Sequence, residues 1–172
     1  PEGVLFLLTA DSLAGVLPTI RSRCVSFAIA PVSPADCARY CTAHGVDKKT
    51  AALYSELFDG HIGTVLTAAR DKARTEQVDK AMELARAAQA GDSYTAAVLL
   101  APYEKDKAGV AALLRDLRAV AAAGLQGSPH APVQGQQAQR TLRLAEAAIQ
   151  RLGAQVNPKI VLTVFAARLA HA

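Results

Sequence analysis

Residues 157–170, with the sequence NPKIVLTVFAARLA, carry the pattern that decides the fold of the chain. Asn157 is a residue type that caps helix N-termini, and Pro158 suits the first helical position, where its missing N–H loses no partner. Beyond this start, apolar side chains recur at three- and four-residue spacing: Ile160, Val161, Val164, Phe165 and Leu169. Such a stripe lies on one face of a helix and needs a partner helix to cover it. The stretch therefore predicts a helix that belongs to a bundle.

The composition extends this preference to most of the chain. Alanine accounts for 37 of the 172 residues, and residues of the apolar class make up 51%. Alanine loses little conformational entropy in a helix, so this composition favours helices and argues against an all-β sandwich. The apolar content also excludes a disordered chain. The predicted helices span residues 34–44, 47–58, 61–72, 75–90, 93–101, 105–124, 136–153 and 157–170. The first of them is expected to begin with Ser33 as its cap and Pro34 at its first position.

The N-terminal segment follows a different pattern. Residues 4–9 (VLFLLT) are apolar and rich in β-forming types, which predicts a strand buried on both faces. Residues 24–29 (CVSFAI) alternate and predict a second strand. Between them, a short helical turn is expected over residues 12–17, ending before Pro18. Two strands cannot form a covered sheet, so the segment predicts only the truncated end of an α/β core.

The predicted elements give a mainly α fold in three parts. Residues 1–31 form the end of the α/β core, residues 32–73 a three-helix domain, and residues 74–172 a bundle of five helices. The chain starts with Pro1 rather than Met, directly before a strand pattern. We therefore expect it to be a piece of a larger protein.

Several classes of protein do not fit the sequence. The longest apolar runs, residues 4–8 and 96–101, fall short of the ~18–20 residues that a membrane-spanning helix needs. No charged and then apolar leader opens the chain. Three cysteines are too few, and an odd number, for a secreted disulfide scaffold. A cytoplasmic protein without membrane contact is expected.

The cysteines and histidines suggest packing rather than metal chemistry. Cys37 and Cys41 share one face of a predicted helix, and His44 follows three residues later. Tetrahedral zinc takes four ligands, and no fourth is evident. Free cysteine behaves well as a small core residue, so we predict that both thiols are buried and bind no metal. His61, His130 and His171 have no partner at a suggestive spacing and are predicted to lie on the surface.

The stretch TIRSRC (residues 19–24) places two arginines between a turn and a predicted strand. The guanidinium group is planar, permanently charged and multidentate, which suits it to stabilise charge on transferring phosphate oxygens. An arginine at the edge of one subunit can act on a nucleotide held by the next. Taken alone, the pair Arg21 and Arg23 is more typical of a solvated surface or a local salt bridge.

The surrounding residues 6–31, FLLTADSLAGVLPTIRSRCVSFAIAP, resemble the end of the ATPase core in clamp-loader subunits of bacterial DNA polymerase III, which are AAA+ proteins. In that family a strand called sensor 1 is followed by a short helix, and then by a proline and Ser-Arg-Cys. Pro18 and residues 22–24 match this order. The resemblance implies that Arg23, next to Ser22, is an arginine finger that reaches ATP on the adjacent subunit. It also implies that Thr9 lies at or near sensor 1.

Two later segments extend the resemblance. Residues 58–66 (FDGHIGTVL) look like the opening of the last helix in the lid domain of these subunits, and residues 157–169 resemble the last helix of their collar domain. The ATP-hydrolysing members place an arginine where this chain has Gly63. No Gly-x-x-x-x-Gly-Lys phosphate loop occurs either. The resemblance thus implies that this chain binds no cofactor and that ATP is bound by the neighbouring subunit. It favours the delta-prime type of subunit, which donates a finger without hydrolysing ATP.

The resemblance also implies partners. The collar would assemble with other clamp-loader subunits (gamma/tau and delta), and the complex would load the sliding clamp on primed DNA during replication. We expect neither catalytic activity nor a small-molecule substrate for this chain alone. The collar interface residues expected on the last helix are Asn157, Ile160, Val161, Val164, Phe165 and Arg168. An ATP-hydrolysing gamma/tau subunit and a stand-alone helical adaptor, in which Arg23 is replaceable, are the alternatives.

Overall fold

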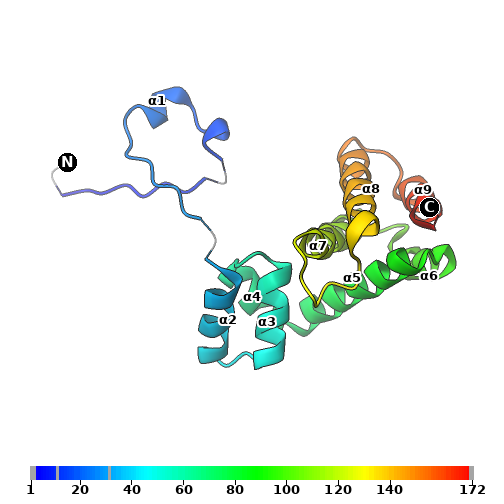
Figure 1. The fold of residues 1–172 in the computed structure, drawn as a ribbon. Helices are drawn as coiled ribbons and strands as arrows, with labels where there is room; N and C mark the ends of the chain where they lie inside the picture. Colours follow the sequence, from blue (N-terminus) through cyan, green and yellow to red (C-terminus); the bar gives the residue numbers. More distant parts are fainter. Residues whose placement is uncertain (1–2, 11, 31, 171–172) are drawn as a thin grey trace. The chain divides into compact units, whose positions relative to one another are not determined.

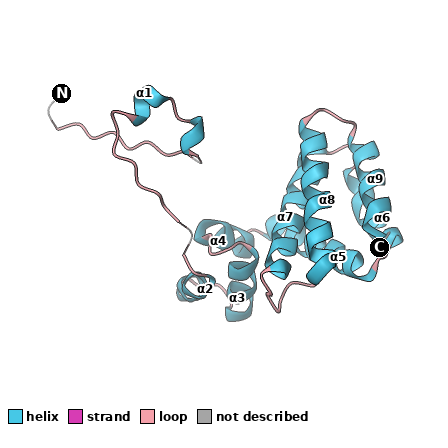
Figure 2. Cartoon of the chain, turned by 45° about the horizontal axis from the view of Figure 1, so that its top comes forward, coloured by secondary structure: helices cyan, strands magenta, loops and turns pink. Residues whose placement is uncertain are grey.

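The computed structural model describes residues 3–10, 12–30 and 32–170 (Figure 1). All regular structure within these ranges is helical, as Figure 2 shows, which confirms a mainly α chain. No helix in the described part is both long enough and apolar enough to cross a membrane. The chain divides into two units, Pro1–Ala30 and Pro31–Ala172.

The first unit contains a 3₁₀ turn, η1 (Leu13–Gly15), and one short helix, α1 (Pro18–Arg21). The predicted strands at residues 4–9 and 24–29 are absent: both stretches are irregular. Their apolar side chains lie in solvent, with Ile29 94% exposed. A strand is stable only when other strands pair with it and its apolar face is covered, and this unit supplies neither. The prediction of two strands was therefore wrong for the described residues.

The short helical turn predicted over residues 12–17 is confirmed as η1, which lies within these residues and ends before Pro18. The serine at position 12 accepts a hydrogen bond from the backbone N–H of Ala14 and caps η1. Pro18 begins α1, at a position where its missing N–H leaves no carbonyl unpaired. The sequence analysis did not predict α1, although proline is suited to the first turn of a helix.

The second unit opens with three short helices: α2 (Pro34–Ala43), α3 (Lys48–Leu57) and α4 (Ile62–Arg70). Ser33 caps α2 by accepting the backbone N–H of Asp36, as its position before a proline predicted. The first two helices pack against each other, and Cys37 and Cys41 are fully buried between them. The predicted core role of both thiols is confirmed.

Gly60 joins α3 to α4 at a position that admits no side chain. Its φ is +73°, and a Cβ atom there would lie 1.7 Å from the carbonyl oxygen of Val32. Only glycine adopts this conformation readily, and only glycine leaves room for the Val32 backbone. This close approach fixes where the chain enters α2 relative to the start of α4.

Five further helices complete the second unit: α5 (Lys72–Ala90), α6 (Ser93–Leu100), α7 (Lys107–Leu125), α8 (Gly135–Gly153) and α9 (Pro158–Ala170). A 3₁₀ turn, η2 (Ala101–Tyr103), follows α6. Each helix packs against the next around a closed ring, in the order α5, α7, α8, α9 and α6, and α6 returns to α5 (Figures 1 and 2). The core of the ring is leucine, valine and alanine. We call these five helices the bundle.

α5 begins three residues earlier than predicted. Asp71 ends α4 and also caps α5, since its carboxylate accepts the backbone N–H groups of Ala73 and Arg74. Asp71 therefore lies between two helices, as the C-cap of α4 and the N-cap of α5, and is not part of a continuous helix. Thr75 adds a contact between these two helices by donating its hydroxyl to the carbonyl of Ala68, 2.7 Å away.

Candidate functional site

Arg23, the predicted arginine finger, follows directly on α1. The hydroxyl of Ser22, the C-cap residue, donates to the carbonyl of Thr19 at 3.2 Å. The backbone N–H of Arg23 donates to the carbonyl of Ile20 at 3.0 Å. These two bonds hold the backbone of the turn and leave the Arg23 side chain in solvent.

Exposure does not single out Arg23 within its unit. Every described residue from Gly3 to Ala30 is exposed except Val16, which is half-buried. Thr9, expected at or near sensor 1, lies in the irregular stretch and is exposed as well. The first unit therefore presents Ser22 and Arg23 together in one turn, while Thr9 belongs to a stretch that forms no regular structure.

A second candidate surface is formed by α6 and α9, which pack side by side in the bundle. Both helices are apolar around most of their circumference. A helix of this kind is normally buried on all sides. Here one side of each helix faces solvent, with Tyr94 78% exposed, Val98 53% and Ile160 59%. We call Tyr94, Val98 and Ile160 the outer face.

The predicted interface residues of α9 divide into two groups. Val161 and Phe165 are buried in the core of this chain, as is Leu169 on the same helix. Their apolar stripe is thus covered by the chain's own helices, as the stripe's need for a partner helix predicted. Ile160 is exposed and Val164 is half-buried. These two are the apolar members that remain at the surface.

The two polar residues among the predicted interface residues, Asn157 and Arg168, take part in hydrogen bonds at the ends of α9. Asn157 is exposed and caps the helix by accepting the backbone N–H of Lys159 at 2.9 Å. The side chain of Arg168 is exposed, while its backbone carbonyl accepts a hydrogen bond from the Arg140 guanidinium at 2.6 Å. The Arg140 cation thus stabilises a free carbonyl near the C-terminal end of α9 and ties that end to α8.

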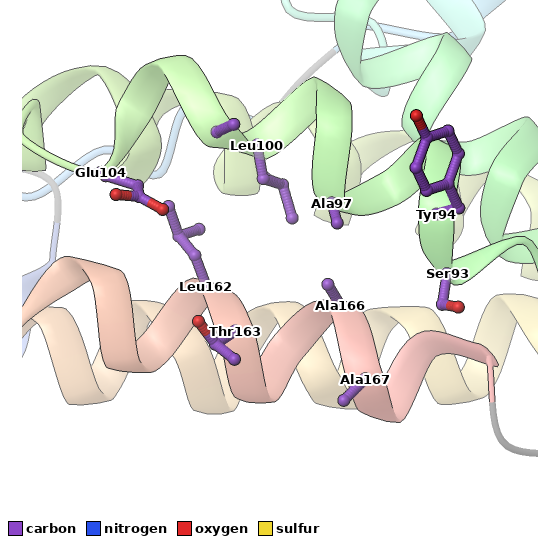
Figure 3. Close-up of a pocket in the computed structure, with 10 residues that line it drawn as sticks. Ser93, Tyr94, Ala97, Leu100, Glu104, Leu162, Thr163, Ala166 and Ala167 are labelled. Atoms are coloured by element: carbon purple, nitrogen blue, oxygen red, sulfur yellow. The ribbon is translucent and has the colours of Figure 1, made fainter.

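A shallow cleft of about 400 Å³ runs between α6 and α9 (Figure 3). Leu100 and Ala97 from α6 face Leu162 and Ala166 from α9 across it. Ser93 and Tyr94 lie at one end of the cleft and Glu104 at the other. Small alanine side chains on both walls leave this hollow open. An apolar side chain of a partner protein fits it better than a charged ligand does.

An ion pair lies at the Glu104 end of this cleft. Lys159 lies 3.4 Å from the carboxylate of Glu104, and both side chains are well exposed. The Lys107 ammonium donates to the amide oxygen of Gln155 at 2.7 Å. An apolar centre with a polar rim is the usual make-up of a protein–protein interface.

Sequence reasoning missed Tyr94 and Val98 as members of this surface. The signal was present in residues 93–100, SYTAAVLL, because a helix without a polar face has no side suited to water. The prediction assigned the interface to α9 alone because only that helix showed a clear stripe. The packing of α6 against α9 is a tertiary contact, and a local sequence pattern does not predict which helices pack together.

The cysteines show no reactive site in the core. Burial, reinforced by the neighbouring thiol of Cys37, raises the pKa of Cys41 to about 11. A thiol of this kind stays protonated and inert near neutral pH. Cys24, by contrast, is exposed beside Arg23. Among the described residues, no group of three or more His, Cys, Asp or Glu side chains gathers in the way that holds a metal ion.

Of the histidines predicted on the surface, His171 lies outside the described residues, and His61 and His130 are exposed. His130 also has a partner. The Nδ1 atom of His130 lies 2.9 Å from the carboxylate of Glu56, which is 74 residues earlier in the chain.

No family model, no curated protein and no solved structure matches this chain. The Arg23 turn and the surface between α6 and α9 are the two candidate functional regions of the chain.

Proposed function

We propose that this chain is part of a clamp-loader subunit of bacterial DNA polymerase III, of the delta-prime type. The observation that carries the proposal is the order Pro18, Ser22, Arg23 and Cys24, which resembles the arginine-finger motif of that family. Pro18 starts a short helix, Ser22 ends it, and Arg23 follows with its side chain in solvent. This local geometry is compatible with an arginine that acts on another subunit.

The proposed chemistry is electrostatic. When the neighbouring subunit cleaves ATP, negative charge develops on the transferred phosphoryl oxygens and the leaving group. The Arg23 guanidinium would donate hydrogen bonds to those oxygens and stabilise that charge. An arginine finger of this kind contributes about 10³–10⁵ in rate at the site that it completes. Ser22, through its bond to Thr19, would orient the turn rather than touch the nucleotide.

The proposed assembly uses the bundle. The outer face exposes Tyr94, Val98 and Ile160 on the two helices that form the shallow apolar cleft, and Tyr94 also lines that cleft. Tyrosine is among the residues that contribute most to binding at protein interfaces. We assign this surface to contact with the equivalent bundle of another clamp-loader subunit. Such contacts would hold the ATPase modules together while the sliding clamp is loaded on primed DNA.

Gly63 favours the delta-prime type over the ATP-hydrolysing type. The residue lies in the first turn of α4, and a Cβ there would meet open space. An arginine would therefore fit at this position, and its absence is not imposed by packing. The family's ATP-hydrolysing members use an arginine at this position to hold the nucleotide, and this chain has a glycine instead.

The test is reconstitution with the partner clamp-loader subunits and the sliding clamp. DNA-stimulated ATP hydrolysis and clamp loading are measured for the wild type, for Arg23→Ala and for Arg21→Ala. Arg21 lies in the same turn and is equally exposed, so it is the matched control. Arg23→Ala is expected to abolish turnover at one ATP site, and Arg21→Ala to leave it intact. Equal activity of all three proteins would refute the proposal and favour the stand-alone adaptor.

A further inference from the structure

The loop between α7 and α8, residues 126–134, is fixed at its C-terminal end by packing. Val133 and Ala131 are buried, and Val133 lies so close to α7 that a Cβ on Gly124 would be 1.9 Å from its carbonyl oxygen. The backbone N–H of Gln134 donates to the side-chain oxygen of Gln89 on α5 at 2.9 Å. This end of the loop is therefore part of the bundle core.

The tip of the loop is bonded to α7 through its backbone and to α3 through its side chains. The backbone N–H of Ser128 donates to the carbonyl of Ala123 at 3.0 Å, and the side-chain amide of Gln134 donates to the carbonyl of Ser128 at 3.2 Å. The hydroxyl of Ser128 donates to Oε2 of Glu56 on α3, and Nδ1 of His130 lies 2.9 Å from the same oxygen. Burial acts to raise the pKa of Glu56, but the hydrogen bonds from Ser128 and His130 outweigh it and leave that pKa below its ordinary value. One carboxylate oxygen thus carries both side-chain bonds between the loop tip and α3.

A cleft of about 510 Å³ lies between this tip and the first two helices. Ala38 of α2 and Ala52 of α3 contribute to one wall, and residues 126–129 form the other. The loop lies beside α3 in both views of the chain (Figures 1 and 2). Because the wall on the helix side is built from small residues, little apolar packing adds to the bonds from Glu56.

We propose that residues 126–130 form a releasable strap, held across this cleft by the Glu56 carboxylate. The side chains of the tip bond to α3, whereas Ala131 and Val133 are buried in the bundle core, so loss of the Glu56 bonds frees the tip from α3 while Val133 stays in place. Release removes the bonds to Ser128 and His130 together, since both end on one oxygen. The cleft between the strap and α2 and α3 is then widened. The inference goes beyond the proposed function and uses only contacts within residues 32–153.

The strap is tested by amide hydrogen exchange on the full chain. Glu56→Ala removes the shared acceptor, and Ser128→Ala removes one donor while leaving α3 unchanged. The N–H groups of Gly127 and Ser128 bond to carbonyls at the end of α7, and these bonds should open more often once the tip is freed from α3. Exchange at these two amides is expected to rise about tenfold in Glu56→Ala and by a smaller factor in Ser128→Ala. The amides of α7 between Val110 and Val120 should exchange as in the wild type.

The matched control is Glu83→Ala, which removes an exposed carboxylate from α5 in the same unit. It should leave exchange in the loop unchanged. Unaltered loop exchange in both Glu56→Ala and Ser128→Ala would refute the proposed strap, because the Glu56 carboxylate would then not hold the loop tip against α3. A rise of equal size in the loop and in α7 would also overturn it, because the loop would then open only when the whole bundle unfolds.

Discussion

Arg74 and Asp116 form a bidentate ion pair that joins the start of α5 to the middle of α7. One guanidinium nitrogen lies 2.6 Å from Oδ1, and the other contacts Oδ2. Gln77 donates a further hydrogen bond to Oδ2 at 2.8 Å. The Arg74 guanidinium also lies over the ring of Phe58, 5.6 Å from its centroid. Since Phe58 ends α3, this single cation connects the three short helices to the bundle.

The first prediction concerns this pair. In Asp116→Asn, the guanidinium loses its counter-charge in a site where the Asp116 side chain is only 7% exposed. Breaking a buried ion pair on one side leaves the other charge without compensation, so the free energy of unfolding should fall by about 3 kcal/mol. Urea unfolding followed by circular dichroism measures this loss.

The control is Asp79→Asn, an exposed carboxylate on α5. Surface substitutions of this kind usually change stability by no more than about 0.5 kcal/mol. If both variants lost the same small amount, Asp116 would contribute no more than a surface charge. The ion pair would then not be what joins α5 to α7.

The second prediction contrasts two glycines that lie three residues apart. Gly60→Ala forces a Cβ against the Val32 carbonyl in a left-handed conformation, and should cost about 2 kcal/mol of unfolding free energy. Gly63→Ala adds a methyl group in open space within α4, and should gain about 0.5 kcal/mol because alanine favours helix. Thermal unfolding of the two variants should move in opposite directions. A gain for Gly60→Ala would contradict the close approach.

The caps show what sequence patterns predict well. Ser33 and Asn157 were both predicted as caps, and both accept backbone N–H groups at a helix start. A cap depends on residues within one turn, so its signal is local. Asp71 is a cap as well, but it lies in a run of charged residues that also fits a helix surface. Helix boundaries in such runs are set by packing, and the packing is not local.

The strands and the Glu56 contacts could not be predicted for the same reason. Residues 4–9 have high β propensity, but a strand exists only where a partner strand meets it. Glu56 and His130 are 74 residues apart, and neither belongs to a motif. The stripe on α9 predicted that the helix would be buried, yet not which apolar residues would remain outside. That division depends on where α6 and α8 pack against it.

The third prediction concerns the thiols. Cys37 and Cys41 are fully buried, whereas Cys24 is exposed. A thiol reagent at pH 8 should therefore modify one cysteine in the folded protein and three after addition of denaturant. Mass spectrometry of the labelled peptides identifies the site. Rapid labelling of Cys41 in the folded state would show that α2 and α3 do not protect it.

The raised pKa of Cys41 gives a fourth prediction. In the unfolded chain this thiol ionises at its ordinary value of about 9, while in the folded protein it stays protonated up to about 11. The stabilisation from this difference is fully present below pH 9 and is lost as the pH rises toward 11. Between pH 9 and 10.5, the free energy of unfolding should therefore fall more steeply for the wild type than for Cys41→Ala. Equal slopes would mean that burial does not raise this pKa.

The fifth prediction uses two adjacent residues of α9. Ile160 is 59% exposed on the outer face, while Val161 is buried in the core. Ile160→Lys should change the free energy of unfolding by less than about 0.5 kcal/mol, because its side chain stays in water. Val161→Ala should cost about 2 kcal/mol, because it leaves a cavity. Thermal unfolding of the isolated chain measures both.

The variants of Ile160 and Val161 also distinguish an effect on folding from an effect on binding to other subunits. If α9 contacts another subunit through its outer face, Ile160→Lys should weaken binding to partner subunits, because it places a charge at the centre of an apolar interface. Val161→Ala should leave binding unchanged at temperatures where the variant is folded, since Val161 contacts only its own chain. Size-exclusion chromatography with the partner subunits reports both effects. Unchanged binding by Ile160→Lys, together with weakened binding by the folded Val161→Ala protein, would remove the outer face from the assembly and place the contact elsewhere on the bundle.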